Sequence, residues 1–129
     1  MIEVFEGNWT IEDVNNNKSK FFIFGDNNLR FGKGGQAIIR GLVNTIGLRT
    51  KKEPNNNSSS FYTDDDYDDN ILRIKQDVDV IRKVHENGSI IVFSSGGYGT
   101  GLAKLNTKAP KTFKYLNDIL LEYFGYKNN

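Results

Sequence analysis

The sequence has no cysteine, only two prolines and a single histidine among its 129 residues. Without thiols the chain can form neither disulfides nor zinc–thiolate sites, and it has no thiolate nucleophile. We therefore expect no redox chemistry. The single histidine, His85, lies near the end of a predicted helix and far along the chain from the glycine-rich segments described below. We expect it to be solvated or to interact with the helix dipole rather than to act in catalysis.

Long apolar runs are also missing. No stretch of about 18 apolar residues is present, and the amino terminus lacks the basic and then apolar pattern of a secretory signal. These absences favour a cytoplasmic protein that does not enter a membrane. The formal net charge of +1 argues against nucleic acid as a partner, because such proteins neutralise many phosphates. No residues have the spacing of metal ligands, so we expect no metal site and no cofactor.

The sequence does contain an alternation of apolar strands and amphipathic helices. We predict strands at residues 1–6, 21–24, 45–50 and 90–93, and helices at 36–43, at 67–86 and from Pro110 to Gly125, whereas 9–14 is ambiguous. The runs Phe21–Phe24 and Ile90–Phe93 are apolar throughout, as in strands buried on both faces. We therefore expect residues 1–129 to form one α/β domain, a three-layer α/β/α sandwich around a mostly parallel or mixed sheet.

Two glycine-rich segments follow the two most apolar strands. One is Gly32-Lys33-Gly34-Gly35, before the predicted helix 36–43, and the other is the Gly-Gly-Tyr-Gly-Thr-Gly run at 96–101. Glycines let backbone N–H groups approach an anion, and a helix amino terminus adds partial positive charge. Because ligands of such sheets sit beyond the carboxyl ends of the strands, we expect both segments to line one phosphate-binding cleft. The alternative is that both are tight turns without a ligand.

Two better-known nucleotide sites do not match these segments. The spacing from Gly25 to Gly32 is too long for a Walker A loop, and no serine or threonine follows Lys33 to hold magnesium. Neither segment shows the Rossmann glycine pattern directly after the first strand. Neither a P-loop NTPase nor an ordinary dinucleotide-dependent oxidoreductase is therefore predicted.

Four segments occur in this order along the chain: Val4–Trp9, Phe21–Ile39, Thr50–Lys52 and Gly99–Leu102. In this order they resemble the macrodomain family, and within it the small branch that removes ADP-ribose from protein carboxylates. That branch has a first strand ending in Gly-Asp, a second strand leading into a glycine loop, a Thr-Lys-Lys segment ahead of a long helix, and a Gly-x-Gly-Leu loop before the last helix. The resemblance implies a macrodomain-like fold whose ligand is an ADP-ribose-like nucleotide or an ADP-ribosylated protein.

The resemblance also implies roles for individual residues. Lys51 corresponds to the lysine that attacks the ribose C1″ carbon, and Asn8 stands where the branch has an adenine-reading aspartate. Asp26, Asn27 and Asn28 would hydrogen-bond the distal ribose. The residues whose amides would surround the diphosphate and that ribose are Gly32, Lys33, Gly34, Gly35, Gly97, Tyr98, Gly99, Thr100 and Gly101, with the Ser94 hydroxyl nearby.

The chain departs from the branch at the acid that follows Gly-Leu, which is Ala103 here. Asp26 is then the candidate acid or base beside Lys51. Three interpretations stay open: an enzyme that hydrolyses ADP-ribosyl protein or ADP-ribose 1″-phosphate, a module that binds ADP-ribose without chemistry, and an interaction protein with no nucleotide ligand.

Overall fold

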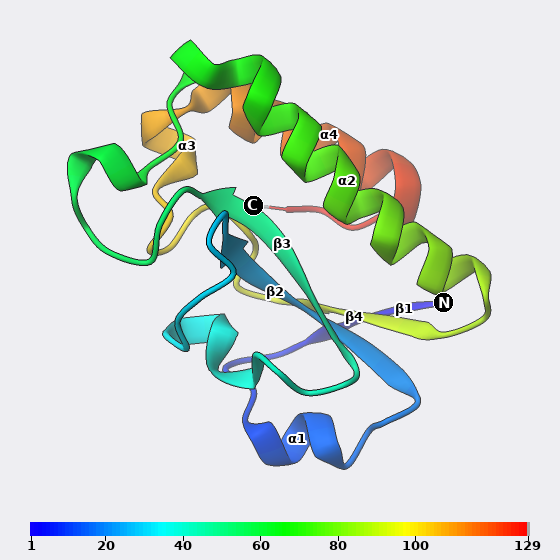
Figure 1. Cartoon of the computed structure of the whole chain (residues 1–129). Helices are drawn as coiled ribbons and strands as arrows, with labels where there is room; N and C mark the ends of the chain where they lie inside the picture. The colour runs from blue at the N-terminus through cyan, green and yellow to red at the C-terminus, as the bar shows by residue number, and fades with distance from the viewer. Residues whose placement is uncertain (129) are drawn as a thin grey trace.

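Within residues 1–128, which the computed structural model describes, four strands form one sheet (Figure 1). The strands β1 (Ile2–Phe5), β2 (Lys20–Asn27), β3 (Thr45–Lys51) and β4 (Ile90–Ser94) lie in the order β1-β4-β2-β3. Every neighbouring pair is parallel, so of the two expected sheets the mostly parallel one is confirmed and the mixed one is wrong. The reason is that each strand connects to the next through a crossover containing a helical segment, whereas an antiparallel neighbour needs only a hairpin. Asn129, the last residue of the expected domain, lies outside the described residues.

The two long helices follow the predicted pattern. Helix α2 (Tyr67–Glu86) has the predicted bounds. Helix α4 (Pro110–Phe124) begins with proline, whose missing N–H is harmless in the first turn, and ends at Gly125 with a φ of 67°. The short helices α1 (Ile11–Asn15) and α3 (Leu105–Lys108) were not predicted. Helix α1 falls in the ambiguous segment, where Thr10 and Asp13 form a capping box.

The helix expected at 36–43 is instead a short 3-10 helix, Gly35–Ile39. Arg40 already has a non-helical ψ of 137°, and Gly41 has a φ of 92°. The chain therefore leaves the helix after Ile39, and the apolar residues further along cannot extend it. Ala37 and Ile39 are buried, whereas Ile38 is 38% exposed.

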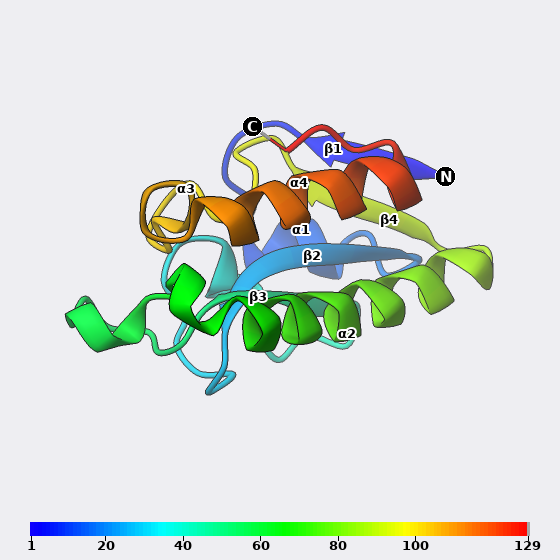
Figure 2. The same cartoon turned by 90° about the horizontal axis from the view of Figure 1, so that it is seen from above.

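Helical segments cover both faces of the sheet (Figures 1 and 2). Helices α2 and α4 lie side by side over one face, while α1 and the 3-10 helix lie on the other. Alternate residues of the apolar strands serve the two cores: Ile23 and Phe93 pack under α2 and α4, and Phe22 and Val92 pack with Trp9 on the opposite face. This explains why β2 and β4 carry uninterrupted apolar runs. No helix within residues 1–128 is long and apolar enough to cross a bilayer.

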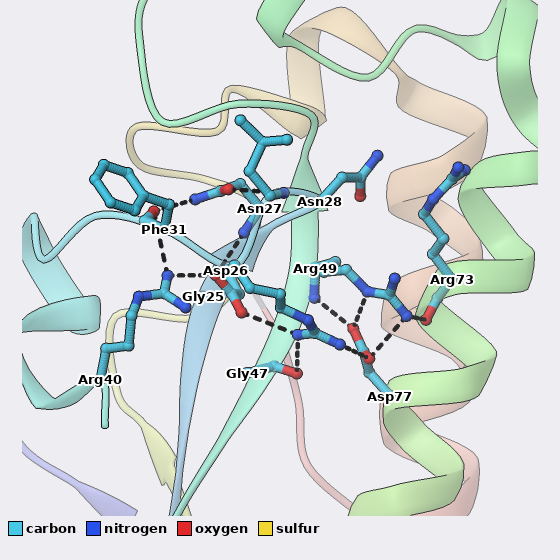
Figure 3. Close-up of polar contacts among 12 residues, drawn as sticks. Gly25, Asp26, Asn27, Asn28, Phe31, Arg40, Gly47, Arg49, Arg73 and Asp77 are labelled. Carbon is cyan, nitrogen blue, oxygen red and sulfur yellow. Dashed lines mark hydrogen bonds and ion pairs between the residues drawn. The ribbon is translucent and has the colours of Figure 1, made fainter. Parts of the chain in front are cut away.

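An ion-pair network around two buried carboxylates joins the carboxyl end of β2 to β3 and α2 (Figure 3). The Asp26 carboxylate on β2 pairs with Arg40 and, at 2.9 Å, with Nη1 of Arg30. The Asp77 carboxylate on α2 pairs with Nη2 of Arg30 at 2.7 Å and with Nε of Arg49 at 3.0 Å. The side chains of Asp26 and Asp77 are only 1% and 4% exposed. Arg30 thus links two buried carboxylates, each of which has a second arginine partner.

The network requires that residue 47, on β3, has no side chain. A Cβ on Gly47 would overlap the Asp26 carboxylate and lie 2.9 Å from Nη1 of Arg30. The Gly47 carbonyl also accepts a hydrogen bond from Arg30 at 3.2 Å. Glycine at this strand position is therefore explained by the close approach of the ion pair.

We expect Gly47→Ala to lower the free energy of unfolding by about 2 kcal/mol or more, because the added methyl group displaces a buried carboxylate from its partners. Urea unfolding measures this change as a lower midpoint with an unchanged slope. The matched control is Gly34→Ala, because a Cβ there meets nothing within 4 Å and the φ of Gly34 is −79°. Equal stability of the two variants would show that the network can rearrange at no cost.

Candidate functional site

The two glycine-rich loops line one cleft of about 430 Å³ at the carboxyl edge of the sheet. The strands that precede them, β2 and β4, are direct neighbours. After β2 the chain turns to the face of α1, where Ala37 and Ile39 are buried, and after β4 it turns to the opposite face, where Leu105 is buried. Neighbouring parallel strands whose connections diverge in this way leave a crevice between their loops. The expectation that both loops open at one edge is confirmed.

Most of the predicted site residues lie together in this cleft. Its lining includes Asn8, Asp26, Asn27, Gly32, Lys33, Gly34, Gly35, Lys51, Gly97, Tyr98, Gly99 and Gly101. Residues that sequence reasoning did not select also line it, namely Gly25, Phe31, Gln36, Ala37, Thr50, Pro54, Leu102 and Ala103.

Three predicted residues, Asn28, Ser94 and Thr100, lie outside the cleft lining, and each side chain has a hydrogen-bond partner within the fold. The Asn28 side chain accepts a hydrogen bond of 2.6 Å from the Tyr62 hydroxyl. The Ser94 hydroxyl accepts one from the amide of Gly96 at 3.1 Å and lines a neighbouring cavity of about 360 Å³, which also includes Asn8. The Thr100 hydroxyl donates to the carbonyl of Gly96 at 3.3 Å.

The loops leave many backbone donors unused. The N–H groups of residues 32–36 and of residues 99–103 donate no hydrogen bond to any atom of residues 1–128. All of these residues except Thr100 line the cleft. Residues 33–35, 101 and 102 are exposed, so these amides are open to water or to a ligand. Two rows of such amides around one cleft favour an anion with several oxygens.

Gln36 holds the two loops together, although sequence reasoning missed it. Its side-chain oxygen accepts a hydrogen bond from the amide of Gly25 at 2.8 Å, and its side-chain nitrogen donates to the carbonyl of Gly97 at 2.8 Å. The Gln36 carbonyl in turn accepts a bond from the Trp9 indole at 3.0 Å. One amide side chain therefore crosses from the end of β2 to the loop after β4.

Tyr98 lines the cleft but its hydroxyl serves the fold. The hydroxyl donates to the carbonyl of Ile23 at 2.6 Å and accepts from the amide of Ser94 at 2.8 Å. Burial raises the pKa of Tyr98 well above its ordinary value. Tyr98 is therefore a neutral phenol, and its hydroxyl ties the loop after β4 to both β2 and β4.

Asp26 and Asn27 also have structural partners. Besides its two arginines, Asp26 accepts a hydrogen bond from the amide of Asn27 at 2.8 Å. The Asn27 side chain donates to the carbonyl of Phe31 at 2.7 Å, and Nε of Arg40 donates to the carbonyl of Gly32 at 2.7 Å. These contacts fix the start of the first glycine loop. The geometry therefore assigns Asp26 a positioning role.

Lys51 is the one cleft residue whose charged group is both buried and unpaired within residues 1–128. It is 7% exposed, and its ammonium lies 4.7 Å from the centre of the Phe61 ring. No carboxylate or other hydrogen-bond acceptor of residues 1–128 contacts this ammonium. Burial lowers the pKa of Lys51, and repulsion from Lys104 lowers it further. The ammonium is thus available to a bound anion, and its neutral amine is available as a nucleophile.

We expect Lys51→Met to be more stable than the natural chain at neutral pH, because it removes a buried charge. Since the pKa of Lys51 is lower in the folded chain than its ordinary 10.5, the unfolded chain binds more protons between the two values. The natural chain therefore gains stability as the pH rises through this window, and the advantage of the variant should shrink toward pH 10.5.

Urea unfolding at several pH values measures the difference, with Lys18→Met as a control that removes the same charge from an exposed position. A variant that is less stable than the natural chain at neutral pH would show that the Phe61 contact outweighs burial.

Comparison with known proteins places the chain in a family. No curated protein and no solved structure matches it. A family model described as a family of unknown function (DUF7831) matches residues 4–119. The matched range covers the end of β1, all of the other three strands, both glycine-rich loops and most of α4. The chain therefore belongs to the DUF7831 family.

Proposed function

We propose that the cleft binds ADP-ribose or a close derivative, with the two glycine-rich loops around the diphosphate, in a macrodomain-like α/β/α sandwich. The observation that carries the proposal is the set of unused N–H groups at 32–36 and 99–103 around one cleft of about 430 Å³. This volume is within the range of small-molecule sites. A diphosphate supplies the several acceptor oxygens that two rows of amides require.

The charges of the cleft support an anionic ligand. Lys33 and Lys51 line it, and no ion pair within residues 1–128 neutralises either of them. Among the cleft-lining residues within 1–128, Asp26 is the only one with a carboxylate, and two arginines neutralise it. An anion that enters the cleft therefore meets net positive charge.

Binding without chemistry is the function that the geometry supports best. The resemblance to the hydrolase branch implies an acid after Gly-Leu, and this position is Ala103. Asp26 could replace that acid only if its carboxylate reached the ligand, but both of its oxygens are held by arginines. A well-formed cleft without a free acid can still sequester its ligand.

Hydrolysis of an ADP-ribosyl or ADP-ribose phosphate substrate is the second candidate, and the position of Lys51 favours it. A lysine whose pKa is lowered by burial and by a neighbouring cation is a better nucleophile than an exposed one. The neighbouring cation here is Lys104. This candidate requires chemistry at Lys51 and makes a separate prediction.

Calorimetric titration with ADP-ribose tests the binding proposal. We expect saturable binding, and at least about tenfold weaker binding by Gly34→Ala or Gly101→Ala, because a methyl group keeps the phosphate away from the amides. An added Cβ meets nothing within 4 Å at either position, so the fold should tolerate both changes.

Gly96→Ala is the control, because Gly96 belongs to the same loop region but not to the cleft lining, and its added Cβ would lie 3.4 Å from the Ser94 hydroxyl. It should bind like the natural chain. Absence of ADP-ribose binding to the natural chain would reject the nucleotide and favour an interaction protein.

A turnover assay separates the two candidates. With ADP-ribosylated protein or ADP-ribose 1″-phosphate as substrate, we expect no product above the uncatalysed rate, because no free acid accompanies Lys51. Release of product by the natural chain, lost in Lys51→Ala, would instead establish the hydrolase. Binding of ADP-ribose by both chains shows that each is folded.

A further inference from the structure

Three lysines surround one aromatic ring at the end of the cleft, and we call Lys51, Lys104 and Lys108 the lysine cluster. Their ammonium nitrogens lie 4.7, 5.7 and 5.0 Å from the centre of the Phe61 ring. Phe61 is itself only 3% exposed. The ring is fixed beside the end of β3, because residue 61 forms an antiparallel bridge with residue 51.

The cluster has no counter-charge within residues 1–128. None of its three ammonium groups takes part in an ion pair or donates a hydrogen bond there, whereas Lys20, Lys52, Lys75 and Lys114 all have carboxylate partners. The Phe61 ring attracts cations weakly and cannot cancel their mutual repulsion. Lys51 is in addition 7% exposed, so one of the unpaired charges is also poorly hydrated. Such an arrangement is stabilised by an external anion.

The cluster is continuous with the cleft. Lys51 belongs to the cleft lining, and Lys104 directly follows Ala103, which also lines it. The cluster therefore lies next to the second glycine-rich loop and shares Lys51 with the cleft. A ligand that serves the amides of both loops and the three ammonium groups at once needs a further anionic group besides its diphosphate, because each region offers several unpaired donors.

We propose that the lysine cluster is a second anion subsite, which receives a further phosphoryl group of a ligand whose diphosphate lies between the glycine-rich loops. This inference rests on the proposed function, because it takes the loops as the diphosphate site. It adds the class of ligand: a compound with at least three phosphoryl groups, two in the loops and one at the cluster. Oxygen atoms of a phosphoryl group can accept hydrogen bonds from several ammonium groups at once.

Titration with inorganic polyphosphates tests the subsite without assuming a nucleotide. We expect the natural chain to bind tripolyphosphate at least about tenfold more tightly than pyrophosphate. In Lys104→Gln/Lys108→Gln this preference should fall to about threefold or less, while the affinity for pyrophosphate changes little, because the loops are intact. Both substituted side chains are exposed, and urea unfolding checks the fold.

The control is Lys18→Gln/Lys83→Gln, which removes the same charge from two exposed lysines outside the cleft. It should keep the preference, because a subsite acts locally whereas general attraction depends on net charge. An equal preference in the two double variants would overturn the subsite. A second measurement uses the natural chain alone: tripolyphosphate should protect the amines of the lysine cluster from reductive methylation, and equal protection by pyrophosphate would also overturn it.

Failure of the proposed function is distinguishable from failure of the subsite. If the natural chain does not bind ADP-ribose, but its preference for tripolyphosphate depends on Lys104 and Lys108, the subsite is supported and the nucleotide is rejected. If ADP-ribose binds and the preference does not depend on these lysines, the subsite alone is rejected.

Discussion

The ion pair between Asp26 and Arg40 is the contact on which the cleft depends. Asp26 ends an apolar strand, so its carboxylate would be buried without compensation if no cation reached it. Arg40 supplies that cation and also holds the carbonyls of Phe31 and Gly32. The same guanidinium therefore neutralises the strand end and fixes the loop that follows it. Arg30 extends this constraint to Asp77 on α2, so the first glycine loop is anchored to both layers of helices.

The predictable part of the fold is the part that local pattern determines. Uninterrupted apolar runs identified β2 and β4, and helical spacing identified α2, because burial of one or two faces leaves a regular record in the sequence. The parallel direction of every strand pair depends on crossovers between distant segments, and the mixed alternative could not be excluded. The helix predicted at 36–43 is shorter in the structure, because the chain leaves the helical conformation at Arg40 and Gly41, and Arg40 pairs with Asp26, which is distant in the sequence.

The sequence predicted where the backbone of the candidate site lies better than it predicted the contacts of its side chains. Glycine positions indicate where amides are accessible, and both loops do line one cleft. The partners of polar side chains lie far away in sequence: Gln36 reaches Gly97, and Tyr62 reaches Asn28. No spacing rule connects such pairs. The bonds that Asp26, Asn28 and Ser94 make within the fold could therefore not be predicted from the sequence.

At this edge of the sheet, some polar groups are hydrogen-bonded within the chain and others are not, and this difference distinguishes residues that hold the fold from residues that are open to a ligand. Asp26, Asn27, Gln36 and Tyr98 have their polar atoms bonded within the chain, and this rigid frame holds the loops in place. The amides of 32–36 and 99–103 have no acceptor there, and Lys51 has no counter-charge there. Residues 33–35, 101 and 102 are exposed, so water can reach their amides, whereas the buried charge of Lys51 is unpaired at a cost in stability. An anion with phosphoryl oxygens is the ligand class that would accept hydrogen bonds from the amides and pair with Lys51 together.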